Sequence, residues 1–464
     1  MYSQFSLMKI HLYNTLTRQT ELFTPLKANE ASIYACGPTV YSFAHIGNLR
    51  AYIFVDLLHR LLKFSGLNVR LVMNITDVGH LTDDGNDGED KMFVAMRREG
   101  KTAMDIADFY TEAFLSDIKS LNILPAEVYP RATAHILEQI QMIEQLEKNG
   151  FTYQTSDGVY FDTSRLPSYG RLSRQKAEDK QAGVRVEIGE KRNATDFALW
   201  KFSPDGVTRE MIWPSPWGDG FPGWHLECSA MSAKYLGTPF DIHTGGIDHI
   251  AVHHENELAQ TEGATGKLEA NVWMHNEFLT VDSGKMSKSL GNVYTLTDIV
   301  EHGFEPLSYR FMCLSAHYRT KLNFTWEALE AAQNALHKIR STVRDWEKPT
   351  SSLVEFDDRF IATMSDDLKT SEAFAVMWEM INSEAYSGQK AATLLKMDQV
   401  LGLDLAEYIA KPLEVPPVIY ALVSEREQAR SEKRWADSDR LRNEIALLGF
   451  VVEDTAEGSK ITEK

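Results

Sequence analysis

Only three cysteines occur among the 464 residues, at positions 36, 228 and 313. An odd count this low argues against a disulfide framework and favours a reducing compartment. No segment approaches the ~18 consecutive apolar residues of a membrane-spanning helix. The N-terminus also lacks the basic region and apolar core of a secretion signal. We therefore expect a cytoplasmic protein with no membrane partner.

The sequence also lacks a basic excess. Its 48 Lys and Arg are outnumbered by 66 Asp and Glu, which gives a formal net charge of −18. Nucleic-acid binding depends on clustered Lys and Arg, so this balance argues against an RNA or DNA partner for the surface as a whole. Net charge governs solubility and steering rather than local chemistry, and an acidic chain can still carry a basic face.

What the chain does contain is an alternation of strands and helices typical of a parallel α/β sheet. The segment 32–36 has the pattern of a buried strand, and Gly37-Pro38 ends it. Apolar residues recur at helical spacing over 47–66, and a second strand is expected at 69–75. Strand patterns return at 240–243 and 273–281. With 43% apolar residues, a chain of this length is expected to form two to four domains.

Two motifs describe one nucleotide site closed from two sides. His45-Ile46-Gly47-Asn48 stands at an expected strand-to-helix turn, where glycine admits a ligand to the backbone and the helix offers free N–H groups to phosphate. Lys285-Met286-Ser287-Lys288-Ser289 brings two lysines that can stabilise charge on a departing pyrophosphate. The order and spacing of the two motifs resemble those of class I aminoacyl-tRNA synthetases.

A second constellation makes the resemblance more specific. Cys36, Trp224-His225-Leu226-Glu227-Cys228 and His253-His254-Glu255-Asn256-Glu257 are similar to motifs of the cysteinyl-tRNA synthetases, and the match runs from about Met8 to the C-terminus. Further segments agree with this family: Asn74-Ile75-Thr76-Asp77, Asp196-Phe197-Ala198-Leu199-Trp200-Lys201, Trp213-Pro214-Ser215-Pro216-Trp217-Gly218 and Glu453-Asp454-Thr455. Several independent motifs in the same order are hard to obtain by chance.

The resemblance implies one zinc ion per chain, held by Cys36, Cys228, His253 and Glu257. The spacing of these residues does not by itself show a metal site, because an isolated buried cysteine is more often a core residue. Helix geometry favours His253 over His254, since His253 shares a face with Glu257, whereas the residue four after His254 is Leu258. A closed structural zinc that never meets substrate is the alternative.

The same resemblance implies the fold class and the domain order. The expected fold is α/β, with a Rossmann-like parallel-sheet catalytic domain at 8–120 and 206–268, interrupted by a connective insertion at 121–205. A stem-contact region with the lysine loop is expected at 269–321. A helical bundle at 322–411 and a small C-terminal anticodon-binding region at 418–464 complete the chain.

The implied enzyme is a ligase that joins L-cysteine to ATP as cysteinyl-adenylate and passes the cysteinyl group to the 3′ end of tRNA(Cys). Zinc stabilises a deprotonated thiol, so a zinc site can distinguish cysteine from serine without an editing domain. The expected catalytic residues are His45, Asn48, Lys285 and Lys288. The ATP site adds Gly47 and Ser287, and Mg²⁺ accompanies the ATP.

The resemblance also assigns the cysteine-binding residues, which are Gly37, Thr76, Trp224, His243 and Asp248. An aromatic wall and a carboxylate can hold the backbone portion of a zwitterion. Without the resemblance, Trp224 would be interpreted as a core aromatic residue and His243 as a satisfied histidine at a strand end.

The C-terminal segment is the remaining place for RNA contacts. Arg426, Arg430 and Arg434 recur at every fourth position and are candidate tRNA-binding residues on one helix face. Interleaved glutamates fit a solvated, salt-bridged surface instead. The family often ends in Gly-Thr-x-Trp, whereas this chain has Gly458-Ser459-Lys460-Ile461 and lacks an aromatic residue that could stack on a base. We expect a monomer.

Two other functions fit part of the same sequence. A ligase of the mycothiol type makes the same adenylate but transfers cysteine to an amino-sugar. That ligase lacks the full C-terminal RNA-binding module, whereas this chain extends to Glu453-Asp454-Thr455. A non-catalytic zinc-binding or RNA-binding paralogue is the other alternative, and the intact His45, Lys285 and Lys288 argue against it.

Overall fold

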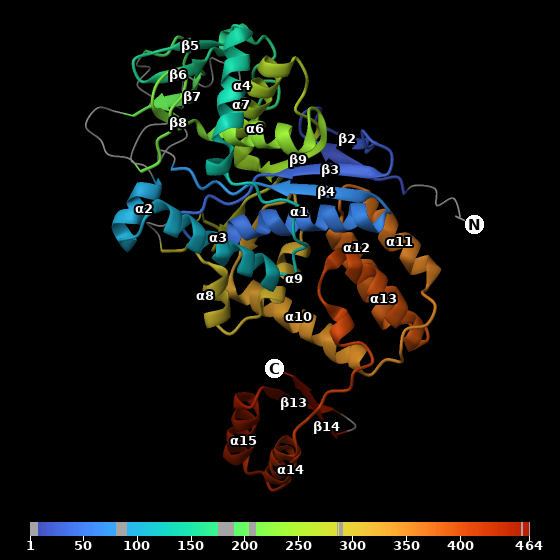
Figure 1. The fold of residues 1–464 in the computed structure, drawn as a ribbon. Helices are drawn as coiled ribbons and strands as arrows, with labels where there is room; N and C mark the ends of the chain where they lie inside the picture. Colours follow the sequence, from blue (N-terminus) through green and yellow to red (C-terminus); the bar gives the residue numbers. More distant parts are fainter. Residues whose placement is uncertain are drawn as a thin grey trace.

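A four-stranded parallel sheet forms the centre of the molecule (Figure 1). The computed structural model describes residues 8–79, 91–174, 190–203, 210–284, 286, 291–455 and 458–463. The order of the strands in the sheet is β10 (Ala270–Asn276), β9 (Phe240–Gly246), β3 (Glu30–Ala35) and β4 (Asn68–Met73). Every neighbouring pair is parallel, as the alternating strand and helix pattern predicted.

Successive residues of the central strands face two separate cores, because strand side chains alternate between the two faces of a sheet. On β3, Ile33 joins the larger core, which includes α1 (Ile46–Phe64), while Tyr34 joins a second core with α6 (Trp224–Leu236) and α7 (His253–Thr265). Figure 1 shows α1 on one side of the sheet and α6 and α7 on the other. The sheet is therefore buried on both faces, as its continuous apolar strands require.

The insertion contains helices and a small antiparallel sheet. Two helices, α2 (Lys91–Glu99) and α3 (Ala103–Ser120), precede the expected insertion and pack in the core of α1, and α4 (Ile136–Lys148) lies within the insertion. The sheet has the order β5 (Thr152–Gln154), β6 (Gly158–Phe161), β7 (Phe197–Phe202) and β8 (Gly220–Pro222), and β5 and β6 form a hairpin. Since β8 pairs with β7, this small sheet continues to residue 222, past the expected end of the insertion at 205.

The segment after the central sheet differs from the expectation in two ways. The stretch 273–281 is not one strand, because β10 ends at Asn276 and the separate β11 (Leu279–Val281) pairs with β12 (Leu322–Phe324). The central sheet thus includes β10, beyond the expected boundary at 268. Two helices, α8 (Leu296–Glu301) and α9 (Pro306–Leu314), lie between β11 and β12 in the chain.

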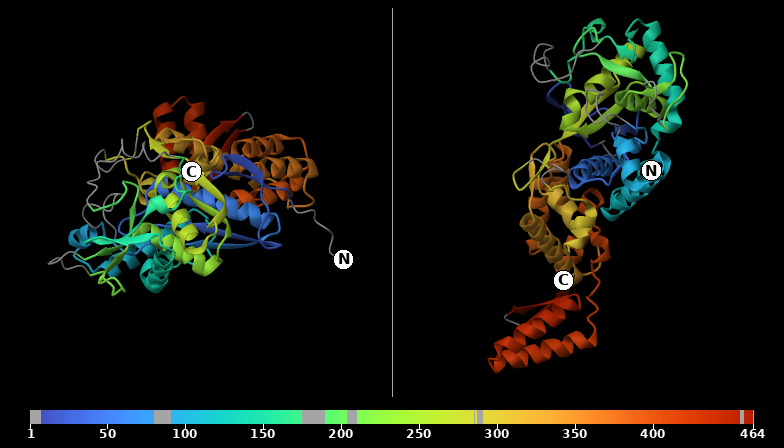
Figure 2. Two further views of the ribbon diagram at one scale, coloured as in Figure 1. Left: turned by 90° about the horizontal axis from the view of Figure 1, so that it is seen from above. Right: turned by 90° about the vertical axis from the view of Figure 1, so that its left-hand side faces the viewer.

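A helical bundle and a separate C-terminal lobe complete the chain. The bundle is formed by α10 (Trp326–Arg344), α11 (Val354–Ser365), α12 (Thr370–Asn382) and α13 (Ser387–Leu401). The lobe contains α14 (Pro417–Ser431), α15 (Trp435–Leu447) and the hairpin β13 (Phe450–Thr455) with β14 (Gly458–Glu463). It has its own small core and extends away from the bundle (Figure 2).

A short hairpin, β1 (His11–Asn14) with β2 (Gln19–Leu22), lies at the N-terminal end of the described chain. None of the described helices combines the length and the apolar composition that crossing a membrane requires.

Candidate active site and metal centre

The first nucleotide motif forms the beginning of α1. His45 is the N-cap residue in an extended conformation, and its Nδ1 accepts a hydrogen bond from the Asn48 backbone N–H at 3.3 Å. The Asn48 side-chain oxygen accepts from the His45 N–H at 3.2 Å, which completes a capping box. The two polar residues of the motif therefore hold each other in place at a helix N-terminus, where backbone N–H groups favour phosphate.

The second nucleotide motif lies next to the first. A Cβ atom added at Gly47 would lie 2.5 Å from Met286 Cε, so glycine is needed for this close approach. Met286 is the one residue of its motif within the described chain. Lys285, Ser287 and Lys288 lie outside the described residues.

Cys36, Cys228, His253 and Glu257 come together from three elements. Cys36 follows β3, Cys228 lies in α6, and His253 and Glu257 lie four residues apart on α7. One donor atom from each of the four lies within 4.8 Å of the others, and His253 Nε2 is 2.8 Å from Glu257 Oε1. Four convergent sulfur, nitrogen and oxygen donors fit the coordination number and donor preference of zinc. The described residues thus contain a set that can hold one zinc ion.

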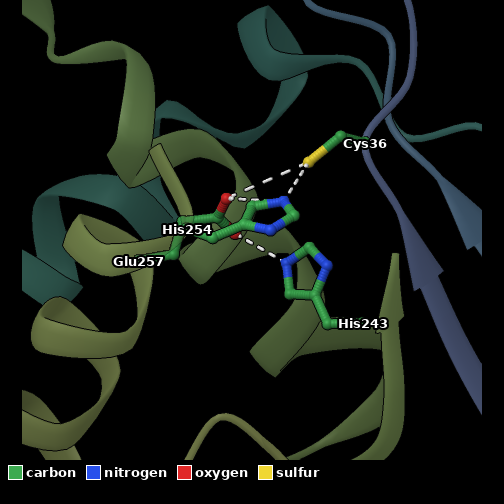
Figure 3. A group of neighbouring side chains, drawn as sticks. All are labelled: Cys36, His243, His254 and Glu257. Atoms are coloured by element: carbon green, nitrogen blue, oxygen red, sulfur yellow. Dashed lines mark hydrogen bonds and ion pairs between the residues drawn. The ribbon is translucent and has the colours of Figure 1, made fainter. Parts of the chain in front are cut away.

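A second set of donors shares two members with the first. His243 and His254 also converge with Cys36 and Glu257 (Figure 3), and Cys36 Sγ is 3.2 Å from His254 Nε2. His254 Nε2 is 3.9 Å from Glu257 Oε1, because residues three apart on a helix are neighbours as well as residues four apart. The spacing argument that set His254 aside considered only the four-residue relation and missed this contact.

The surroundings of the cluster favour the deprotonated, anionic forms of the Cys36 and Glu257 side chains. Burial would raise the pKa of the Glu257 carboxyl, but the charges of His253 and His243 lower that pKa to about 2. Burial would likewise raise the pKa of the Cys36 thiol, but the hydrogen bond from Cys228 and the charge of His254 bring it well below its usual value. Thiolate and carboxylate are the forms that bind metal.

Outer hydrogen bonds orient both adjacent histidines. His253 Nδ1 lies 2.8 Å from His225 Nδ1, and His254 Nδ1 lies 2.7 Å from His275 Nε2. The other nitrogen of His275 is 2.8 Å from Thr15 Oγ1. Such second contacts fix ring orientation at metal sites. Sequence reasoning assigned no role to His225 or His275, although His225 stands within a motif that it used.

Gly37 and Thr76 lie beside this centre. The Gly37 N–H donates to Asn74 Oδ1 at 2.8 Å, and a Cβ on Gly37 would lie only 1.7 Å from the Asn74 carbonyl oxygen. The Thr76 hydroxyl donates to Glu227 Oε2 at 3.0 Å and accepts from the Asn74 side chain at 2.9 Å. The ends of β3 and β4 are therefore joined by a buried polar network, which the sequence did not reveal.

Comparison with known proteins identifies the family. Residues 22–334 match the model of the tRNA synthetases class I (C) catalytic domain, and residues 414–460 match the cysteinyl-tRNA ligase anticodon binding domain. The cysteine–tRNA ligase 1 of Burkholderia lata is 52% identical over 98% of this chain and 97% of its own length. The cysteine–tRNA ligase of Treponema denticola is 43% identical, with 97% and 98% covered.

This chain belongs to the cysteine–tRNA ligase family. The fold also resembles that of a Mycobacterium tuberculosis methionyl-tRNA synthetase solved with methionyl-adenylate, with a TM-score of 0.53 at 15% identity over 82% of this chain and 91% of the other. The family resemblance expected from the motifs and the α/β fold class are thereby confirmed.

Within this cysteine–tRNA ligase family member, the remaining expected pocket residues differ in exposure. Trp224 is half-buried at the start of α6, with its ring centroid 4.5 Å from that of His253. Asp248 has an exposed carboxylate just after β9. His243 is fully buried, and its Nε2 lies 2.9 Å from Glu257 Oε2. In this structure His243 holds Glu257 through this contact, and its expected role in cysteine binding stays a prediction.

The arginine stripe expected in the C-terminal lobe does not exist as one face. Arg426 and Arg430 lie on α14, but Arg434 is the N-cap residue of α15. Arg426 is 2% exposed and forms two 2.9 Å hydrogen bonds with Asp454, so it is a structural residue of the lobe. Arg430 also pairs with Asp454, at 3.2 Å, and Arg434 pairs with Glu432 and Asp437. All three arginines therefore form salt bridges within the lobe, and their role in tRNA binding stays a prediction.

Proposed function

We propose that this chain activates L-cysteine with ATP to cysteinyl-adenylate and transfers the cysteinyl group to the 3′ end of tRNA(Cys). The observation that carries the proposal is the position of Cys36. This residue belongs to the convergent donor set and stands at the end of β3, nine residues before His45, which caps the helix of the nucleotide motif. A thiol-recognising centre and a nucleotide site thus share one edge of the sheet, as expected for ligands of α/β sheets.

The roles at the nucleotide site follow from charge and position. His45 donates a hydrogen bond toward the α-phosphate, and Asn48 holds His45 through the capping box. Gly47 leaves room for the adenosine. Lys285 and Lys288 stabilise the departing pyrophosphate, with Ser287 as a further contact and Mg²⁺ bound to ATP.

The zinc centre uses Cys36, Cys228, His253 and Glu257. When bound, zinc supplies a borderline-soft Lewis acid that stabilises a deprotonated thiol. Serine has a hydroxyl in place of the thiol, which is a poorer ligand and ionises far less readily. A purely apolar pocket separates near-isosteres by only about 10²-fold, whereas an unsatisfied polar site can reject them by about 10⁴-fold. The chain therefore needs no editing domain.

An aromatic side chain and a carboxylate face the backbone portion of the substrate. Trp224 supplies an aromatic wall next to His253, and the exposed Asp248 carboxylate binds the amino group. Gly37 and Thr76 shape the pocket through the Asn74 and Glu227 network rather than through free hydrogen-bonding groups.

The test is cysteine-dependent ATP–pyrophosphate exchange by the purified protein, with serine as the competing substrate. We expect exchange with cysteine only, and loss of that exchange in Cys228→Ser. Cys313→Ser is the matched control, because Cys313 is also a buried cysteine but lies in α9, outside the donor set. Equal exchange with serine, or normal exchange in Cys228→Ser, would indicate that the zinc ion has a structural role and does not recognise the substrate.

The C-terminal lobe favours tRNA over an amino-sugar as the acceptor. An adenylate-forming ligase that charges an amino-sugar has no need of this lobe, whose residues 414–460 match the anticodon binding domain. We expect purified protein to charge tRNA(Cys) but not a glucosamine-based acceptor. Exchange activity without tRNA charging would favour the amino-sugar reaction, and absence of any exchange would favour the non-catalytic paralogue.

A further inference from the structure

A polar cavity lies where the helical bundle meets the C-terminal lobe. It has a volume of about 320 Å³ and is lined by side chains from α10, from the linker after α13 and from β14. Figures 1 and 2 show that this joint is the place where the lobe approaches the rest of the molecule. The contact across it is sparse, with Lys460 Nζ of β14 lying 4.0 Å from Asp345 Oδ2 at the end of α10.

Cationic side chains from separate segments converge on this cavity. Arg340 and Arg344 stand four residues apart on α10, and Lys460 faces them from the lobe. Glu305 and Asp345 are the two carboxylates in the lining. Three permanent positive charges therefore meet two negative ones, in a chain whose net charge is −18.

Tyr408 holds the two arginines in place. Arg340 Cζ lies 4.5 Å and Arg344 Cζ 4.9 Å from the centre of the Tyr408 ring. Cations over an aromatic face are stabilised there, and guanidinium groups fixed in this way lose less entropy when they bind an anion. The cavity thus has preorganised guanidinium groups rather than loose surface cations.

Arg340 also retains unused hydrogen-bonding capacity. Its side chain is 7% exposed, and one of its terminal nitrogens binds Glu305 at 2.6 Å. Its Nε–H is buried and has no hydrogen-bond acceptor among the described residues. A buried unsatisfied donor is costly and points to a missing acceptor. His337 shares Glu305 with Arg340, at 2.5 Å, so that carboxylate is already engaged on both oxygens.

We propose that this cavity binds a phosphate of the tRNA backbone. The inference rests on the proposed function, because the joint lies between the body that carries the catalytic sheet and the C-terminal lobe, both of which the tRNA contacts in that proposal. Guanidinium and ammonium groups are the usual partners of phosphate, and such contacts position RNA without reading its sequence. A phosphate bound here also links α10 to β14 and fixes the lobe against the bundle.

Salt dependence of tRNA charging tests the proposal. A plot of log kcat/KM against log salt has a negative slope. Each lost phosphate contact makes this slope shallower by about 1, over a range of about 50 to 200 mM salt. We expect that shallower slope for Arg344→Gln and for Lys460→Gln, while Arg344→Lys retains the wild-type slope. Lys396→Gln is the matched control, because Lys396 is as exposed as Lys460, at 47%, and also pairs with an aspartate, but lies on α13.

Two further readouts separate the possible failures. Cysteine-dependent pyrophosphate exchange does not need tRNA, so it should be unchanged in every variant; absence of exchange in the wild type would refute the proposed function instead. Inorganic phosphate that raises Tm in the wild type but not in Arg344→Gln, with unchanged salt slopes, would identify a free phosphate as the ligand and overturn the RNA proposal. Slower tRNA charging with an unchanged salt slope would show that these residues act only through packing at the joint, and it would also overturn the RNA proposal.

Discussion

Met286 lies against Gly47, and this contact joins the two nucleotide motifs. The residues are far apart in the sequence, yet a Cβ at Gly47 would lie 2.5 Å from Met286 Cε. Such a distance is shorter than van der Waals contact, so a larger residue at position 47 must move the end of the Met286 side chain, and it would also crowd the His45 ring, whose Cε1 lies 3.0 Å from the same point. The glycine thus leaves room for Met286 against the start of α1.

We expect Gly47→Ala to reduce kcat/KM for ATP in pyrophosphate exchange by about 10²-fold or more, because small displacements of a catalytic group have effects of this size. Gly284→Ala is the control. A Cβ there would meet its nearest atom at 3.4 Å, an ordinary contact, although Gly284 lies just before the second motif. Equal activity of Gly47→Ala and the wild type would show that the contact is not needed for ATP use.

Zinc content will distinguish the two adjacent histidines. We expect His253→Asn to lose most of its zinc, because His253 belongs to the donor set that includes both cysteines. His254→Asn should weaken zinc binding by only about 10–100-fold, the usual effect of an outer contact, and remain loaded at micromolar zinc. Metal analysis of the dialysed proteins measures this, with circular dichroism to confirm folding. The reverse result would assign the site to Cys36, His243, His254 and Glu257.

The parallel sheet was predictable because its signals are local. Buried strands followed by Gly37-Pro38 and by a helix at 47–66 define a strand–helix–strand unit without reference to distant residues, and the structure has β3, α1 and β4 in these places. The break between β10 and β11 was not predictable in the same way. Both strands are apolar, and their separation depends on pairing with different partners, β9 and β12.

The candidate site likewise has residues that local motifs point to and contacts that depend on residues distant in the sequence. The motifs identified Cys36, Cys228, His253 and Glu257, and the structure brings their donor atoms together. The contacts of His275 with Thr15 and of Thr76 with Glu227 join residues that are distant in the sequence, and no periodicity encodes them. The pairing of Arg426 with Asp454 is of the same kind, because Asp454 lies on a different element of the lobe.

A buried ion cluster connects the nucleotide helix α1 to α9, and its loss should destabilise the catalytic core. Asp56 of α1 lies 2.8 Å from Arg60 Nε and 2.5 Å from Arg310 Nη2, and both pairs are almost fully buried. Asp56→Asn removes the carboxylate that both buried guanidinium groups contact and leaves Asp398 as the remaining acid near them, and breaking a buried ion pair costs about 3–5 kcal/mol. We expect a clearly lower urea midpoint for this variant.

Glu127→Gln is the matched control for Asp56→Asn. Glu127 pairs with Arg70 at the surface, where both side chains are about half exposed, and an exposed pair contributes less than about 1 kcal/mol. Similar urea midpoints for the two variants would show that the Asp56 cluster adds no stability beyond that of a surface pair.

The last prediction concerns how the stability contributed by the contact between Glu305, at the start of α9, and α10 depends on pH. Burial would raise the pKa of Glu305, but hydrogen bonds from His337 and Arg340 lower it to about 2, from an ordinary value of 4.5. A lowered carboxyl pKa stabilises the folded state above pH 4.5, and this stabilisation is lost as the pH falls toward 2. Wild type should therefore have a higher Tm than Glu305→Gln at pH 6, and the difference should shrink steadily below pH 4.5. Calorimetry across this range measures the difference in Tm.

Because Glu305 is partly exposed, solvent screening keeps the difference in Tm modest. A Tm difference that stays constant from pH 6 to pH 3 would mean that the carboxylate charge does not stabilise the joint.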